Sequence, residues 1–217
     1  MKKRVLKIKM GRNINLNQQN KKSRENFIYS NFIEGIFYLG KIKKYFWFSV
    51  ILFFVIGLVG FLFPIFFQEE ILKLIQDLVK QTEGLGTLEL INFIIFNNMK
   101  SAFFGMIFGI FLGLVPLGII VVNGYVLGFV ANKSVMVEGI SVLWRLVPHG
   151  IFELPAIFIS TALGLRLGMF LFFYRGKNRG AEFKKWFWNS LKVFILIVIP
   201  LLVIAGIIEG VLIGVVG

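Results

Sequence analysis

Residues 147–174 read VPHGIFELPAIFISTALGLRLGMFLFFY, and this stretch decides the fold class of the chain. A transmembrane α-helix needs about 20 predominantly apolar residues, so the stretch is long enough to cross a bilayer. Its first turns hold His149, the single histidine of the chain, and Glu153. Ionisable groups at membrane depth are costly and usually face protein or a water-filled cavity. The stretch therefore predicts a transmembrane helix with polar groups set against neighbouring helices.

The composition of the whole chain agrees with a membrane protein. Of its 217 residues 57% are hydrophobic and 26 are Phe, with a mean hydropathy of +0.82. Soluble domains are less apolar than this. We therefore expect an all-α, polytopic transmembrane helical bundle over residues 45–217, placed in the lipid bilayer of the plasma membrane.

The net charge of +13 comes from basic residues that cluster beside the apolar stretches. This is the pattern of cytoplasmic anchoring, so we expect no nucleic-acid partner. Residues 1–24 are rich in Lys, Asn and Gln and predict a basic, disordered cytoplasmic tail. In residues 25–44 the apolar side chains recur every three or four positions, which predicts an interfacial helix.

Residues 45–67 carry no formal charge and predict the first span. The next residues, 68–80, alternate an apolar face with a charged face and predict an amphipathic helix at the membrane surface. Residues 68–98 contain two Lys against five Asp and Glu. Because basic residues favour the cytoplasmic side, we expect this segment on the opposite side from the tail.

The middle of the chain leaves the number of spans open. Residues 101–122 predict a second span, in which Pro116 predicts a kink or a turn. The apolar stretch 118–131 is short for a crossing and fits a short or broken segment.

A short basic connection, residues 175–190, precedes the last predicted span at 191–216. Its basic residues and its aromatic belt are typical of a cytoplasmic loop. If the loop and the tail share a side, an even number of crossings separates them, and residues 118–131 must traverse. This gives about five spans. A count of four would leave the basic loop outside, and the sequence keeps that alternative open.

Small residues recur at every fourth position in three of the spans. Such ladders let helix backbones approach closely in a membrane, so we predict that these helices pack together in the centre of the bundle, and the ladders would also allow a homodimer. The predicted packing residues are Gly105, Gly109 and Gly113, then Ala156, Ser160, Gly164 and Gly168, and finally Gly206, Gly210 and Gly214.

Polar side chains inside the spans predict a network within the bundle. His149 and Glu153 lie four residues apart on one helix face, and Glu209 lies beside a ladder glycine. Such a network could satisfy unwound backbone, or it could line a path for an ion or a substrate. Arg166 is either a snorkelling residue or a partner of Glu209. The predicted network consists of His149, Glu153, Glu209, Asn123, Asn98 and Arg166.

The residue inventory argues against catalysis. The chain has no cysteine, one histidine and no Gly-x-Ser-x-Gly motif. His149, Glu153 and Glu209 could hold one divalent ion only if their geometry allowed it. We therefore expect no enzyme activity, no catalytic residue, no cofactor and no metal.

Several of these motifs resemble the stage II sporulation protein M family over about residues 95–215. The specific part is Pro148-His149-Gly150 with Glu153 three residues after the glycine. The other matching positions are Asn97, Asn98, Asn123, Gly124, Gly128, Pro155, Ala156, Gly164 and residues 205–209. In sporulating bacteria the resemblance implies a membrane scaffold that anchors two peptidoglycan-degrading partners and is not itself the hydrolase. Relatives also occur in organisms that do not sporulate, so that process does not transfer automatically.

Two functions follow as expectations. The first is an integral membrane scaffold, in which the polar network holds the bundle together and loops are presented to other membrane or envelope proteins. The alternative is a transporter or channel for an ion or small solute, which would use His149, Glu153 and Glu209.

Overall fold

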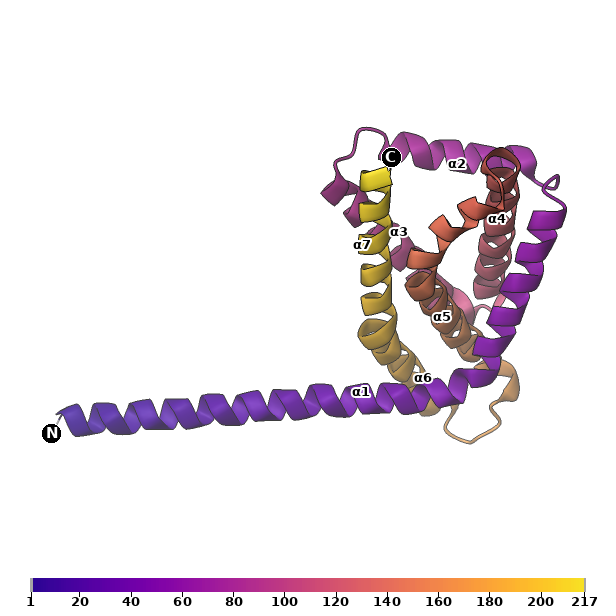
Figure 1. Ribbon diagram of the computed structural model, residues 1–217. Coiled ribbons are helices and arrows are strands. Elements are labelled where there is room, and N and C mark those ends of the chain that lie inside the picture. Colours follow the sequence, from indigo (N-terminus) through magenta and orange to yellow (C-terminus); the bar gives the residue numbers. More distant parts are fainter. Residues whose placement is uncertain (1, 217) are drawn as a thin grey trace.

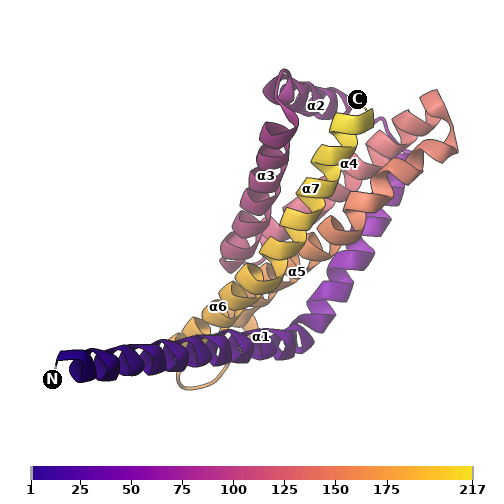
Figure 2. The ribbon, with the colours of Figure 1, turned by 60° about the vertical axis from the view of Figure 1, so that its left-hand side comes forward.

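The computed structural model describes the backbone of residues 2–216 and the side chains of residues 29–214, apart from those of Leu146 and His149. Within this part of the chain the elements are all helical (Figures 1 and 2). They are α1 (Lys2–Leu62), α2 (Gln68–Thr82), α3 (Thr87–Ile107), η1 (Phe108–Ile110), α4 (Leu114–Glu138), η2 (Ile140–Leu146), α5 (Val147–Phe173), α6 (Arg179–Val193), η3 (Phe194–Val198) and α7 (Ile199–Val216).

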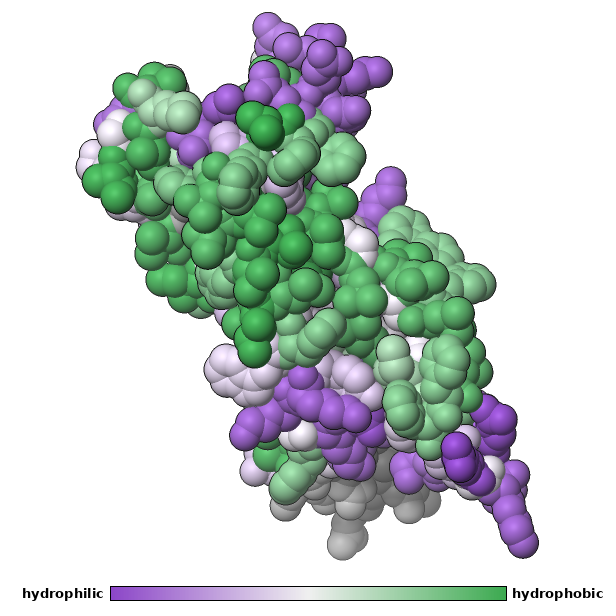
Figure 3. All heavy atoms as spheres, turned by 90° about the vertical axis from the view of Figure 1, so that its right-hand side faces the viewer, coloured by the Kyte–Doolittle hydropathy of each residue, from purple (hydrophilic) through white to green (hydrophobic). Residues whose placement is uncertain are grey.

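Five helical stretches within the described residues are long and apolar enough to cross a bilayer, namely 29–62, 87–110, 114–138, 150–173 and 179–214. Figure 3 shows a broad band of hydrophobic side chains with hydrophilic groups gathered at its two ends, as the hydrocarbon core and the two headgroup regions require. The prediction of an all-α bundle with five spans is confirmed.

Helix α1 changes direction along its length. Its first part lies across one end of the bundle, and its last part rises along the side (Figure 1). Residues 2–24 belong to this helix, whereas their composition predicts disorder. They contain no proline and only one glycine, Gly11, so nothing in them interrupts a helix that continues from residues 25–44.

The second span differs from its predicted boundaries of 101–122. It runs through α3 and η1 from Thr87 to Ile110, and the chain then reverses. Leu112 (φ 57°) and Gly113 (φ 73°) adopt the left-handed conformation at this turn. Pro116 follows in the first turn of α4, where a helix has no intrahelical partner for its N–H groups. The proline therefore helps to start a helix and does not kink one.

The prediction that residues 118–131 are short or broken is wrong. Helix α4 is continuous over 25 residues. It extends beyond the apolar stretch because polar residues at its far end find partners. The amide of Asn132 donates to the carbonyl oxygen of Phe61 (2.8 Å), and the Lys133 amine lies 5.4 Å from the centre of the Phe129 ring.

The two ends of the bundle differ in charge. The basic end consists of α1 residues 29–44 together with residues 174–192, and the acidic end consists of α2 with the connection to α3. At the basic end Lys192 Nζ lies 2.8 Å from Glu34 Oε2. The tail-side part of α1 and the α5–α6 connection therefore share one end, and α2 lies across the other (Figure 1). Four spans separate the tail-side part of α1 from the last span, and an even number of crossings returns the chain to the end from which it started.

The core lies where α3, α5, η3 and α7 meet. Met106, Leu163, Leu167, Val198 and Leu202 are each fully buried there. In the last span a π-helical turn, η3, precedes Pro200. A proline lacks the N–H for an i→i−4 hydrogen bond, and a wider turn before it accommodates the loss.

Candidate functional site

The backbones of α3 and α5 are in direct contact at the predicted small residues. A methyl group added to Gly164 would collide with the carbonyl oxygen of Gly105, and one added to Gly168 would collide with that of Gly109. One turn away, the hydroxyl of Ser160 donates to the carbonyl oxygen of Ala102. Only glycine at these positions lets the two backbones come so close.

Helix α7 packs against α3 through the third ladder. Gly206 faces Ile95, Gly210 faces Ile91, and Gly214 lies beside Thr87. The three ladders that the sequence predicts therefore lie at contacts between α3, α5 and α7, with Gly113 at the turn and Ala156 fully buried on α5.

A second glycine crossing, between α1 and α4, was not predicted. A methyl group on Gly128 would collide with the carbonyl oxygen of Gly57, and one on Gly60 would collide with the backbone of Tyr125. Gly124 lies against the backbone of Phe53. The four-residue spacing of Gly124 and Gly128 is itself typical of a close helix contact. Both residues lie in the stretch 118–131, for which the sequence predicts a short or broken segment.

A cavity of about 720 Å³, lined by apolar residues and by a group of polar side chains, lies between α2, α3, α4, α5 and α7. Apolar residues of α2 and α3 line its part near the acidic end. Four residues of the predicted network line it together, namely Asn98, Asn123, Glu153 and Glu209, and Asn97 lies beside them.

Glu153 of α5 and Glu209 of α7 both face this cavity, and their carboxylates are close enough to act on each other electrostatically. The helices bring them together because α5 and α7 cross alongside α3. Two carboxylates in one partly desolvated site repel each other when both are charged. This pair is the most chemically distinctive feature of the cavity.

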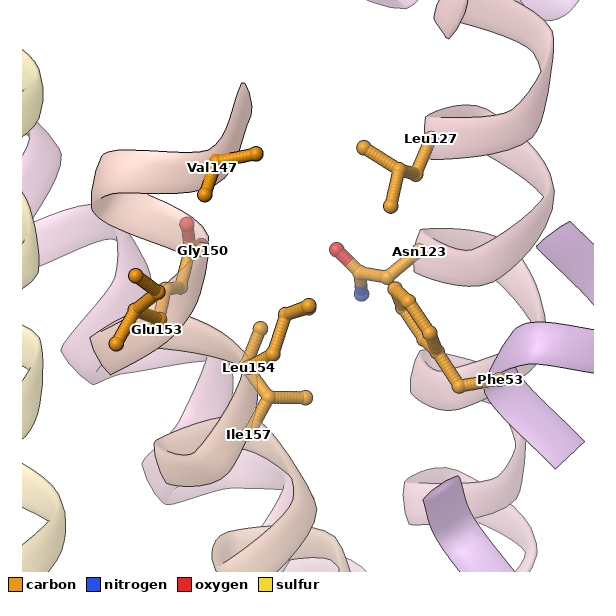
Figure 4. Close-up of a pocket in the computed structure, with 9 residues that line it drawn as sticks. Phe53, Asn123, Leu127, Val147, Gly150, Glu153, Leu154 and Ile157 are labelled. Atoms are coloured by element: carbon orange, nitrogen blue, oxygen red, sulfur yellow. The ribbon is translucent and has the colours of Figure 1, made fainter. Parts of the chain in front are cut away.

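Asn123 of α4 faces the pair from the opposite wall. Its amide nitrogen donates to the carbonyl oxygen of Ile119 (2.8 Å), which leaves its own carbonyl oxygen as an acceptor. Figure 4 shows this oxygen directed into an adjoining pocket of about 390 Å³, across from Val147 and Leu154 of α5, with Phe53 of α1 beside it.

A third, small pocket of about 30 Å³ adjoins Asn123 and Glu153. Asn98, Ser101 and Thr161 supply polar groups to it, and Gly105 lies in its wall. A site of this volume with several polar neighbours is suited to one or two water molecules. Because Gly105 belongs to the α3–α5 contact, this pocket lies directly beside the closed centre of the bundle.

Arg166 does not belong to this network. It lies thirteen residues beyond Glu153 on α5, which is roughly 20 Å along a helix. The guanidinium carbon lies 4.5 Å from the centre of the Tyr38 ring and 4.3 Å from that of Trp186, at the basic end. Its neighbours are therefore aromatic rings, and the idea that Arg166 pairs with Glu209 is not supported. The side chain of His149 lies outside the described residues.

Comparison with known proteins agrees with the family resemblance that the sequence motifs indicate. Residues 48–212 match the family model described as stage II sporulation protein M. An uncharacterized protein of Methanocaldococcus jannaschii is 34% identical over 117 residues, which are 52% of this chain and 51% of that protein. The chain thus spans about half the length of this relative. No solved structure matches the chain.

Proposed function

Because the chain belongs to the stage II sporulation protein M family, we propose that it is an integral membrane scaffold, which anchors other membrane or envelope proteins and has no catalytic activity of its own. The observation that carries this proposal is the closed α3–α5 contact. Gly105 and Gly164 bring the two backbones together directly beside the polar cavity. A rigid centre of this kind suits a protein that holds its surfaces in fixed positions.

The α4–η2 corner supplies a surface for such partners. Four large apolar side chains lie exposed there, Met136 (71%), Val137 (84%), Ile140 (76%) and Trp144 (56%). They lie beyond the part of α4 that packs against α1, near the end of the bundle that α2 covers. Apolar groups that cluster at the membrane boundary are suited to the membrane-embedded part of a second protein.

Site-specific photo-crosslinking in the native membrane tests the scaffold proposal. A photoreactive residue at Ile140 should give a discrete product with one or a few envelope proteins. The same residue at Val55, which is 53% exposed on the span of α1, is the matched control and should label lipid only. Removal of the chain should release the crosslinked partner from its normal membrane location. Equal labelling at both positions, with the partner unmoved, would contradict the proposal.

The polar cavity favours a second candidate function, a transporter or channel for an ion or small solute. Glu153 and Glu209 both line a cavity whose wall also holds three asparagines. Carboxylates and amides are the groups that bind cations in membrane proteins. This function needs the α3–α5 contact to open, since Gly105 and Gly164 close the centre of the bundle in the structure.

Flux measurements on liposomes that contain the purified protein separate the two functions. The scaffold proposal predicts the same flux as empty vesicles across several cations and anions. It also predicts that Glu153→Gln and Glu209→Gln alter the melting temperature of the protein. Flux that disappears in these two variants, at an unchanged melting temperature, would establish the transporter and reject the scaffold.

A further inference from the structure

The most deeply buried charge in the described part of the chain is Arg166, and it lies at the basic end, away from the polar cavity. Its residue is only 8% exposed. The rings of Tyr38 of α1 and Trp186 of α6 both lie within 5 Å of the guanidinium carbon, at 4.5 Å and 4.3 Å from their centres. Helices from three parts of the sequence therefore meet at this one side chain.

The hydrogen-bonding groups of Arg166 are incompletely satisfied. Its Nε and Nη1 atoms are buried and have no hydrogen-bond partner, and no described carboxylate forms an ion pair with it. Ring faces attract a cation, but they accept none of the in-plane N–H bonds of a guanidinium. A buried charge without hydrogen bonds is costly. An acceptor in the plane of the group, which an anion can supply, would satisfy these two atoms.

The surroundings of Arg166 have an excess of positive charge. Residues 29–44 and 174–192 together hold nine Lys and Arg against two Glu. One of them is Lys44, whose amine lies 4.7 Å from the centre of the Tyr45 ring and 5.9 Å from that of Phe173, the last residue of α5. The two Glu are already engaged, because Glu34 pairs with Lys192 and Glu182 lies 3.9 Å from Lys185. Both glutamates of these two segments therefore have a lysine as a neighbour, and neither pairs with Arg166.

The depth of the site matches that of phospholipid headgroups. Arg166 lies seven residues before the end of α5, or roughly 10 Å inside it. Amphipathic helices at a membrane surface lie about 5–10 Å into the boundary between headgroups and acyl chains. Residues 29–44 of α1 and helix α6 cover Arg166 at this depth. Trp186 and Trp188 supply the aromatic side chains that are typical of the membrane–water interface.

From these observations we propose that the basic end binds the phosphate of an anionic phospholipid, with Arg166 as the buried donor and Lys44 as the exposed one. Guanidinium groups bind phosphate through two parallel N–H bonds, and Nε with one Nη supplies such a pair. The bound lipid would tie α1 to α5 and α6. This site is independent of the proposed scaffold function.

Native mass spectrometry and thermal unfolding of the purified protein test this site. Phosphatidylglycerol should remain bound as a discrete adduct and raise the melting temperature, whereas phosphatidylcholine should do neither. Arg166→Gln should abolish the preference, and Arg166→Lys should weaken binding by roughly ten-fold, because an ammonium group loses the bidentate geometry. Lys184→Gln, at an exposed lysine of α6 at the same basic end, is the matched control and should bind like the parent protein.

Three results would overturn the assignment. The first is an equal response of the parent protein to the two lipids. The second is an undiminished preference for phosphatidylglycerol in Arg166→Gln. The third is full stabilisation by inorganic phosphate alone, which would indicate a site for free anions. If Arg166→Gln does not fold, Lys44→Gln takes its place, and an unchanged lipid affinity in that variant would reject the proposal.

Discussion

The hydroxyl of Tyr38 donates a hydrogen bond of 3.1 Å to the carbonyl oxygen of Trp186, 148 residues later in the chain. The same hydroxyl lies 3.4 Å from the hydroxyl of Ser190. These contacts join the membrane-surface part of α1 to α6 at one end of the bundle. Two segments that are distant in sequence but both basic therefore lie on the same side of the membrane.

Cysteine accessibility should confirm this arrangement in cells. The parent chain has no cysteine, so single cysteines can be introduced without background. We expect Lys41→Cys and Lys177→Cys to react with an impermeant thiol reagent from the same side, and Glu83→Cys, after α2, from the other side. From the positive-inside tendency we expect that common side to be the cytoplasmic one. Opposite labelling of Lys41→Cys and Lys177→Cys would contradict the five-span bundle.

The closed α3–α5 contact should be sensitive to a single methyl group. Gly164→Ala places a methyl group against the backbone of Gly105, so we expect a loss of about 1–3 kcal/mol in stability, as for other overpacked sites. Gly118→Ala on α4 is the control, because a methyl group there meets nothing within 4 Å. Melting temperatures in detergent measure both. An equal effect of the two substitutions would mean that the contact is not close-packed.

The link between α1 and α6 should depend more on its buried hydrogen bond than on its ion pair. Tyr38 is 3% exposed, so Tyr38→Phe removes a buried hydrogen bond and should cost about 1 kcal/mol. The side chain of Glu34 is 61% exposed, and exposed ion pairs contribute about 0–1 kcal/mol, so Glu34→Gln should have a smaller effect. Unfolding measurements on both variants compare the two. A larger effect of Glu34→Gln would show that the ion pair dominates.

Glu153 and Glu209 should be energetically coupled. Because their carboxylates act on each other, neutralising one changes the environment of the other, and the effects of Glu153→Gln and Glu209→Gln on stability should not add. We expect a coupling energy of about 0.5–3 kcal/mol from a double-mutant cycle on the unfolding free energy. Glu83→Gln, on the exposed connection after α2, should add independently to either. Simple additivity of the two cavity substitutions would show that the carboxylates do not interact.

Part of the candidate site could be predicted from the sequence. Glu153, Glu209, Asn98 and Asn123 are polar residues in apolar spans, and the cost of exposing such groups to lipid predicts that they face protein or a cavity. Arg166 is also a charged residue in an apolar span that faces protein, but it lies at the basic end and away from the polar cavity. Its partners are Tyr38 and Trp186, and nothing in the local pattern of α5 indicates which helices cover it.

The sequence by itself determined the fold class and predicted that the acidic segment after the first span lies opposite the basic tail, but it left the number of spans open between four and five. These properties depend on the hydropathy and charge of short stretches of sequence. Each stretch has them whatever the rest of the chain does. Only the tertiary structure decided that the chain turns at Leu112, between η1 and α4, that α4 is continuous, and which glycine ladder meets which. Those features depend on the relative depth and rotation of helices from distant parts of the chain, which no single window contains.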